Sequence, residues 1–149
     1  MEHVKKAQDI INIMRSREPK DIDLVQRTYE FAERAHHGQK RYSGDDYFVH
    51  VAGVGYTLAS MGMDATTISA GLLHDTVEDA PVSEDDIERE FGTEIRFLVD
   101  GVTKLGKLKY RGVERYIENL RKMFIAMAED IRVMIIKFAD RIHNLQTLD

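Results

Sequence analysis

The segment GLLHDTVEDA, residues 71–80, places a cluster of ionisable side chains directly after an apolar run. Leu72 and Leu73 are typical of a buried helix, whereas the next six positions hold one imidazole and three carboxylates. Side chains three or four residues apart share one face of a helix, so these groups are expected to crowd at its end. Such crowding in a partly dry place is unfavourable unless a positive charge lies among the groups. The segment therefore predicts a helical fold with a divalent cation at the end of one helix, beside His74, Asp75, Glu78 and Asp79.

Two simpler interpretations of this segment stay open at this point. A single His–Asp pair is more often a hydrogen-bonded or surface pair than a metal site. The acidic residues before Pro81 also fit a solvated helix end.

Helical spacing of apolar residues continues on both sides of the segment, and no stretch alternates convincingly as a strand would. Asp21, Asp64 and Ser83 are expected N-caps, the last as part of a capping box. The last helix is apolar over a wide arc and is expected to be buried, whereas residues 103–112 are expected to form an exposed loop. The pattern predicts one all-α domain. Its expected helices cover about 22–37, 48–60, 65–80, 84–91, 94–101, 113–127 and 131–145.

The composition is that of one soluble globular domain over residues 1–149, without a signal peptide or a segment near the roughly eighteen apolar residues of a membrane span. The absence of cysteine excludes disulfides and thiolate ligands and makes a reducing cytoplasm the expected location. The net charge of −5 gives no general affinity for nucleic acid. The excess of basic residues over 104–122 suits a small polyanion such as a nucleotide, or equally a solvated loop and helix face.

Two residues far from the opening segment favour the metal site. His50 lies in the first turn of an apolar helix, and Asp140 lies inside the apolar last helix, where an unpaired aspartate is seldom buried. With His74 and Asp75 they form a set of two imidazoles and two carboxylates. That set suits Mn²⁺, Fe²⁺ or Co²⁺, allows Zn²⁺, and disfavours the all-oxygen sites of Mg²⁺ and Ca²⁺. A cation held in this way would activate a water and polarise a phosphoryl group.

Glu78 and Asp79 follow the ligand pair on the same side of the expected helix. They are placed to orient or deprotonate the water as general bases. The alternative is a pair of solvated charges at a helix end. We interpret them as the catalytic pair.

Four stretches of the chain resemble one protein family. They are HHGQKRYSGDDYFVH (36–50), GLLHDTVEDA (71–80), FGTEIRFLVDGVTKLGK (91–107) and EDIRVMIIKFADRIHNLQTL (129–148). In this order they are similar to the hydrolase (HD) domain of RelA/SpoT-type synthetase/hydrolases, which handle the alarmone (p)ppGpp. The resemblance implies an HD-domain helical bundle that removes pyrophosphate from the 3′ position of ppGpp or pppGpp. The implied products are GDP or GTP, the implied metal is Mn²⁺, and the reaction would end the stringent response signal.

The resemblance also implies roles for single residues. Arg41 matches a residue that packs against the guanine base, Ser43 belongs to the same recognition loop, and Asn144 and Thr147 match nucleotide contacts. Without the resemblance, an exposed loop cation and a helix C-terminal cap are the simpler interpretations. The matches to the family's metal ligands are His50, His74, Asp75 and Asp140, and the matches to its water-activating pair are Glu78 and Asp79.

The chain departs from the family pattern at four positions. Tyr42 stands where a basic residue is common, Asp46 and Val51 stand where prolines are frequent, and Gln146 stands where arginine is common. Because the family's hydrolase domains usually continue through more helices, we expect an N-terminal fragment of a longer chain that also carries a synthetase domain. Two other functions stay open: a non-catalytic alarmone-binding or regulatory module, and an HD phosphohydrolase for another nucleotide.

Overall fold

Every regular element that the structure describes is a helix, which confirms the expected all-α fold. The computed structural model describes residues 4–40, 46–106, 117–118, 120–121 and 130–146. Within these ranges, the only β-type pairing is an isolated backbone bridge between Lys40 and Asp46. The helices are α1 Ala7–Ile13, α2 Pro19–Ala35, α3 Tyr47–Ser60, α4 Ala65–Leu73, α5 Thr76–Asp79, α6 Glu84–Phe91, α7 Thr93–Gly106 and α9 Ile131–Gln146.

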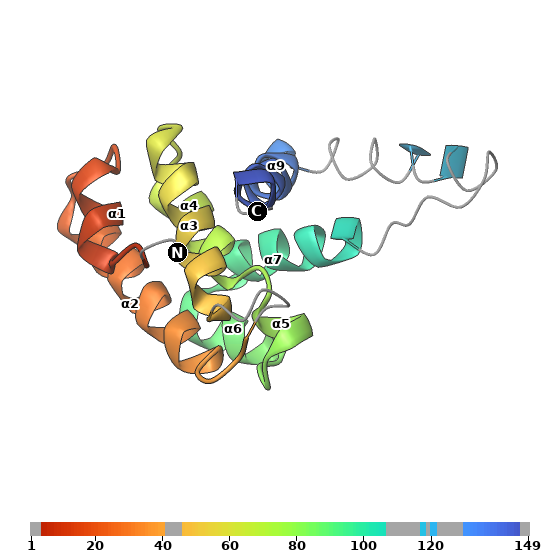
Figure 1. Ribbon diagram of the computed structural model, residues 1–149, viewed down its shortest axis with the longest axis horizontal. Helices are drawn as coiled ribbons and strands as arrows, with labels where there is room; N and C mark the ends of the chain where they lie inside the picture. Colours follow the sequence, from red (N-terminus) through yellow and green to blue (C-terminus); the bar gives the residue numbers. More distant parts are fainter. Residues whose placement is uncertain (1–3, 41–45, 107–116, 119, 122–129, 147–149) are drawn as a thin grey trace.

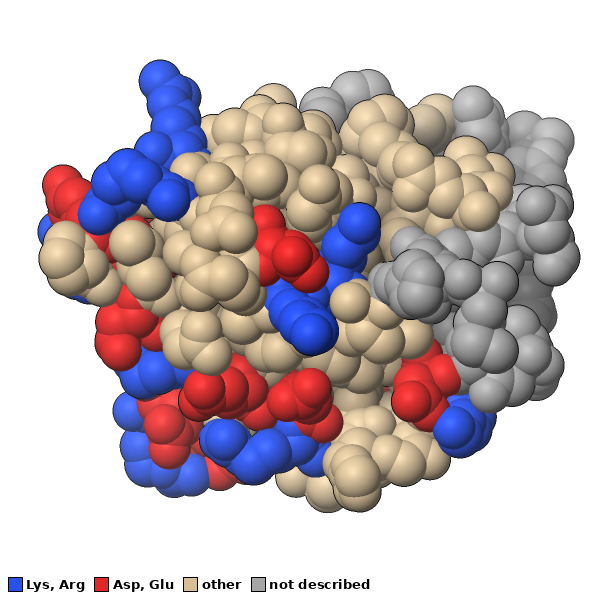
Figure 2. All heavy atoms as spheres, turned by 60° about the vertical axis from the view of Figure 1, so that its left-hand side comes forward, with Lys and Arg blue, Asp and Glu red and all other residues tan. Residues whose placement is uncertain are grey.

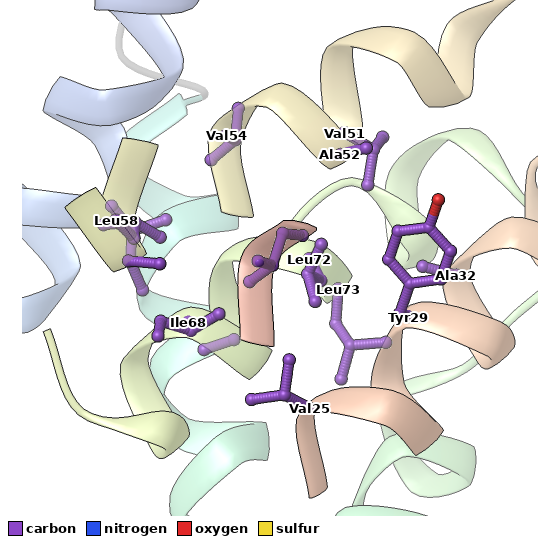
Figure 3. Packing of buried hydrophobic residues seen from close by; sticks show 14 of the residues in the cluster. Val25, Tyr29, Ala32, Val51, Ala52, Val54, Leu58, Ile68, Leu72 and Leu73 are labelled. Carbon is purple, nitrogen blue, oxygen red and sulfur yellow. The ribbon is translucent and has the colours of Figure 1, made fainter. Parts of the chain in front are cut away.

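Helix α4 is the central helix, and α2, α3, α7 and α9 pack against it (Figure 1). All of its residues except Thr66 are buried. A helix that is apolar or small on every side needs neighbours on every side, and α4 has them. Figure 3 shows Leu72 and Leu73 between apolar side chains of α2 and α3. Because α4 ends at Leu73, the residues that follow it start from inside the core.

Two of the three expected N-caps are confirmed. Asp64 accepts a hydrogen bond from the backbone N–H three residues later (2.9 Å), and Ser83 exchanges hydrogen bonds with Asp86 in a capping box. The expectation for Asp21 is wrong, because α2 already begins at Pro19. Proline's fixed φ suits the start of a helix. The carboxylate of Asp21 then lies in the first turn, where its negative charge interacts favourably with the helix dipole.

The single helix expected through residues 71–80 is interrupted. Helix α4 ends at Leu73, and the one-turn helix α5 begins at Thr76. Two side chains donate hydrogen bonds to backbone carbonyls at this point. His74 Nδ1 donates to the carbonyl of Gly71 (2.6 Å), and Thr76 Oγ1 donates to the carbonyl of Leu73 (2.8 Å). Such local bonds compete with the helical hydrogen bonds and favour a break. The expected catalytic pair therefore lies on a separate turn.

Other expectations need correction as well. The sequence patterns do not predict α1, and α7 continues to Gly106, into the range expected to be a loop. Helix α9 is not buried on all sides, since Ile131, Phe138 and Leu145 expose 61–69% of their surface. The expected helix over 113–127 and the rest of the expected loop lie largely outside the described residues.

Charged side chains on the face shown in Figure 2 are mixed in sign, with acidic and basic groups side by side. In the structure, Arg96 pairs with both Asp85 (2.9 Å) and Glu88 (2.7 Å). Among the helices of the described ranges, none combines the length and the apolar character that a membrane crossing requires.

Candidate metal centre

The four residues expected to bind a metal converge in the structure. His50 comes from the first turn of α3, Asp140 from α9, and His74 and Asp75 from the link between α4 and α5. One ligand atom from each of the four lies within 4.8 Å of those of the others. Both histidines and Asp140 are buried, and Asp75 is partly buried. Because α3 and α9 pack against each other and against α4, the core brings together His50 and Asp140, which are 90 positions apart.

The ring of His74 is oriented for a cation. Its Nδ1 donates to the carbonyl of Gly71, so its Nε2 faces the two carboxylates. Nε2 is buried and lies 3.0 Å from Asp75 Oδ2 and 3.4 Å from Asp140 Oδ1, as an ion pair with the two carboxylates rather than as a well-aligned hydrogen bond to either. Burial alone would lower the pKa of His74, but its interactions with Asp75 and Asp140 outweigh burial and raise this pKa well above its ordinary value. The surroundings of Nε2 therefore favour a positive charge.

The expected ligands meet at Asp140. Its Oδ1 lies 2.6 Å from His50 Nε2, while Lys137 Nζ donates to its Oδ2 (3.3 Å). Burial would raise the pKa of Asp140, but the contacts with His50 and His74 hold it well below its ordinary range. Burial of Asp75 is outweighed in the same way, mainly by His74, and the pKa of Asp75 falls to about 2. Both carboxylates are therefore ionised at neutral pH.

This donor set fits a divalent cation. Two ionised carboxylates place negative charge in a largely buried region, and a bound cation relieves it. Two imidazole nitrogens with two carboxylate oxygens suit a first-row transition metal better than Mg²⁺ or Ca²⁺. The buried Nε2 of His74 makes no well-aligned hydrogen bond, although carboxylate oxygens of Asp75 and Asp140 lie within 3.4 Å, and an ion bound between these groups would satisfy it.

The expected catalytic pair lies on the solvent side of the ligands. Glu78 and Asp79 are exposed, and one carboxylate oxygen of each lies within 4.8 Å of one of Asp75. The Tyr47 hydroxyl lies 2.9 Å from Asp79 Oδ2 and 3.0 Å from Asp75 Oδ2, so its single hydrogen is shared between the two carboxylates. The side chain of Gln39 donates to the backbone carbonyl of Asp79. The pair therefore borders the ligand set, and Asp79 is held in place from two directions.

The sequence patterns do not single out three residues of the centre, Tyr47, Lys137 and His143. Each lies three positions from a ligand on the same helix: Tyr47 precedes His50 on α3, and the other two flank Asp140 on α9. His143 is buried, and its Nδ1 lies 2.8 Å from His50 Nδ1. Residues three apart share a helix face, so a search one turn to either side of each ligand could have found all three.

The predicted nucleotide contacts fall only partly within the described residues. Arg41, Ser43 and Thr147 lie outside them. Asn144 is partly buried on α9, four residues after Asp140. This spacing places it on the ligand-bearing side of the helix. Its contact with a nucleotide stays a prediction.

The chain belongs to the HD domain family, which it matches over residues 28–149. The expected resemblance to RelA/SpoT-type proteins is confirmed by individual relatives. The chain is 48% identical over 143 residues to the GTP pyrophosphokinase of Streptomyces coelicolor, covering 93% of this chain and 17% of that protein. It is 45% identical over 130 residues to the guanosine-3′,5′-bis(diphosphate) 3′-pyrophosphohydrolase of Aquifex aeolicus, covering 87% of this chain and 18% of the relative.

A third relative is the bifunctional (p)ppGpp synthase/hydrolase SpoT of Escherichia coli, 48% identical over 132 residues, with 87% of this chain and 19% of the relative covered. The chain thus spans less than a fifth of the length of these relatives.

Proposed function

We propose that this chain forms the part of a RelA/SpoT-type protein that hydrolyses ppGpp or pppGpp at the 3′ position, with Mn²⁺ as its metal. The observation that carries the proposal is the convergence of His50, His74, Asp75 and Asp140 beside two exposed carboxylates. The names of the Aquifex and Escherichia relatives support this reaction. In the proposed reaction, the oxygen of water bonds to the phosphorus attached to the 3′ oxygen. The bond between that phosphorus and the 3′ oxygen breaks, and the 3′ oxygen takes up a proton, so that pyrophosphate and GDP or GTP are the products.

The proposed roles of the residues follow from how deeply their side chains are buried. When bound, the cation lowers the pKa of a water and polarises the 3′ diphosphate. Glu78 and Asp79, exposed beside the ligands, accept the proton of the attacking water. Tyr47 holds the carboxylate of Asp79 in place during this step. The nucleotide approaches from the solvent side, since the other side of the ligand set is closed by the core.

Four residues are proposed to hold the nucleotide. The planar cation of Arg41 can stack on the guanine base, and Ser43 is proposed to take part in the same recognition. Asn144, on α9 beyond Asp140, and Thr147 would contact the nucleoside. A synthetase domain in the natural protein and a cytoplasmic location also stay predictions.

The reaction is tested with the purified chain, Mn²⁺ and a panel of nucleotides. We expect ppGpp to be converted to GDP and pyrophosphate, and GTP, dNTPs and cyclic dinucleotides to be left intact. Chromatography of the products separates release of pyrophosphate from release of single phosphates. Faster turnover of another nucleotide would contradict the substrate assignment, and Mn²⁺ binding without turnover of any nucleotide would favour a binding module.

Variants test the roles of the residues. Asp75→Ala and Asp140→Ala are expected to lose both bound Mn²⁺ and turnover, whereas Asp23→Ala, on the exposed face of α2, is the matched control. Glu78→Gln is expected to keep the metal and to slow hydrolysis by roughly 10²–10⁴-fold, the usual contribution of general base catalysis. Glu30→Gln, also exposed on α2, is its control. Near-normal turnover in Glu78→Gln would remove this residue from the chemistry.

A further inference from the structure

His143 is a buried histidine to which the proposed reaction gives no role. Its side chain comes from α9, one turn after Asp140, and only 1% of its surface is exposed. Its Nδ1 lies 2.8 Å from His50 Nδ1, and the centroids of the two rings are 4.9 Å apart. His143 thus contacts the proposed ligand His50 at Nδ1, whereas Nε2 of the same His50 ring faces the metal centre.

The hydrogen positions on the two rings follow from this contact. A cation takes the lone pair of His50 Nε2, so the hydrogen of the neutral ring must be on Nδ1. That N–H then points at His143, whose Nδ1 has to be the acceptor. His74 shows the same arrangement, since its Nδ1 donates to the carbonyl of Gly71. Each imidazole ligand therefore has its own acceptor, a backbone carbonyl for one and a side chain for the other.

The space for the His143 ring is provided by a glycine on the facing helix. A Cβ at Gly53 of α3 would collide with the His143 ring, and Gly53 lies one turn after His50. The α3–α9 contact thus fixes both rings at once. An acceptor with one fixed position can set the direction in which His50 points as well as its tautomer.

We propose that His143 is a positioning residue: it holds His50 in the tautomer and orientation that present Nε2 to the cation. The inference rests on the proposed function, because it presupposes a metal at His50, His74, Asp75 and Asp140. It adds that the α9 helix supplies both a ligand and the acceptor that orients a second ligand.

The test compares His143→Asn with His143→Leu by calorimetric titration with Mn²⁺. Asparagine places an oxygen acceptor where Nδ1 stood, whereas leucine fills more of the volume of the ring without an acceptor. We expect leucine to weaken Mn²⁺ binding by about 10–100-fold, the usual effect of losing such an outer partner, and asparagine to retain most of the affinity. A purely packing role predicts the opposite order, because asparagine leaves the larger void.

Ile136→Ala is the matched control on the same helix. Ile136 is fully buried on α9, so its truncation loosens packing without removing an acceptor for His50. It is expected to lower stability and to leave Mn²⁺ affinity unchanged.

The outcomes separate the two proposals. If the unaltered chain does not bind Mn²⁺, the proposed function fails, and this inference fails with it. If the unaltered chain binds Mn²⁺ but His143→Leu binds it equally well, or His143→Asn falls as far as His143→Leu, the positioning role alone is overturned. An equal loss of affinity in Ile136→Ala would also overturn it, because general loosening would then explain the effect.

Discussion

Tyr47 links the proposed metal ligands to the proposed water-activating pair. Burial and the neighbouring charges of Asp75 and Asp79 raise the pKa of its hydroxyl, which therefore stays a neutral donor. Tyr47→Phe removes this donor but keeps the ring that stacks on His36, with centroids 5.0 Å apart. A hydrogen bond to a charged group contributes about 1.5–3 kcal/mol, so we expect kcat for ppGpp hydrolysis to fall roughly ten- to hundredfold.

Steady-state kinetics at saturating Mn²⁺ measure this effect. Tyr56→Phe is the control, because Tyr56 lies on the same helix and its ring faces Lys5 Nζ, 4.3 Å from the ring centroid. An unchanged kcat in Tyr47→Phe would mean that Asp79 does not need this donor to take part in the reaction.

Single residues were predictable where their chemistry is unusual for their position. An aspartate in an apolar helix, Asp140, and a histidine beside two leucines, His74, stand out in a sequence because burying them alone is costly. Tyr47 and His143 do not stand out, since tyrosine and histidine are common in ordinary helices. Their roles depend on which side chain of another helix lies within 3 Å, as for His143 Nδ1 and His50 Nδ1 at 2.8 Å, and only the packed structure shows this.

At the scale of helices, the contact between α3 and α4 depends on Gly71. A Cβ at this position would collide with the buried side chain of Leu58. In an open helical position, replacing glycine by alanine stabilises by about 0.5–1 kcal/mol. Here overpacking is expected to dominate, and Gly71→Ala should lower the free energy of unfolding by about 1–3 kcal/mol in urea denaturation.

A double variant checks the cause of this destabilisation. In Gly71→Ala/Leu58→Ala the colliding side chain is absent, so the combined loss of stability should be smaller than the sum of the two single losses. Strictly additive losses would show that the collision is not what destabilises Gly71→Ala.

Helices were predictable where local chemistry sets their ends, as at Asp64 and Ser83, whose side chains accept backbone N–H groups nearby. The break between α4 and α5 was not predictable from apolar spacing, because side-chain bonds to the carbonyls of residues 71 and 73 cause it. The exposed face of α9, which includes Phe138, was not predictable either. An apolar arc shows that a helix can be buried, but the number of neighbouring helices decides how much of the arc is covered.

At the scale of the whole molecule, the proposed metal joins parts of the chain that are far apart in sequence. His50 on α3 and Asp140 on α9 are 90 positions apart, and the link between α4 and α5 supplies the other two proposed ligands. A ligand that binds only the folded state at 100 times its Kd adds about 2.7 kcal/mol to the free energy of unfolding. For 149 residues this corresponds to a rise in Tm of roughly 5–10 °C.

Calorimetric scans with Mn²⁺ and with excess EDTA measure this shift. Asp140→Asn is expected to abolish it, because the substitution removes the charge of a carboxylate whose Oδ1 lies 2.6 Å from His50 Nε2 and 3.4 Å from His74 Nε2. Asp23→Asn changes an exposed aspartate of α2 that pairs with Arg27 of the same helix (2.8 Å) and should keep the full shift. A shift of the same size in Asp140→Asn would place the stabilising ion elsewhere in the molecule. Loss of the shift in both variants would mean that the shift depends on net charge. The ion is therefore assigned to the centre where α3, α4 and α9 meet only if Asp140→Asn loses the shift and Asp23→Asn keeps it.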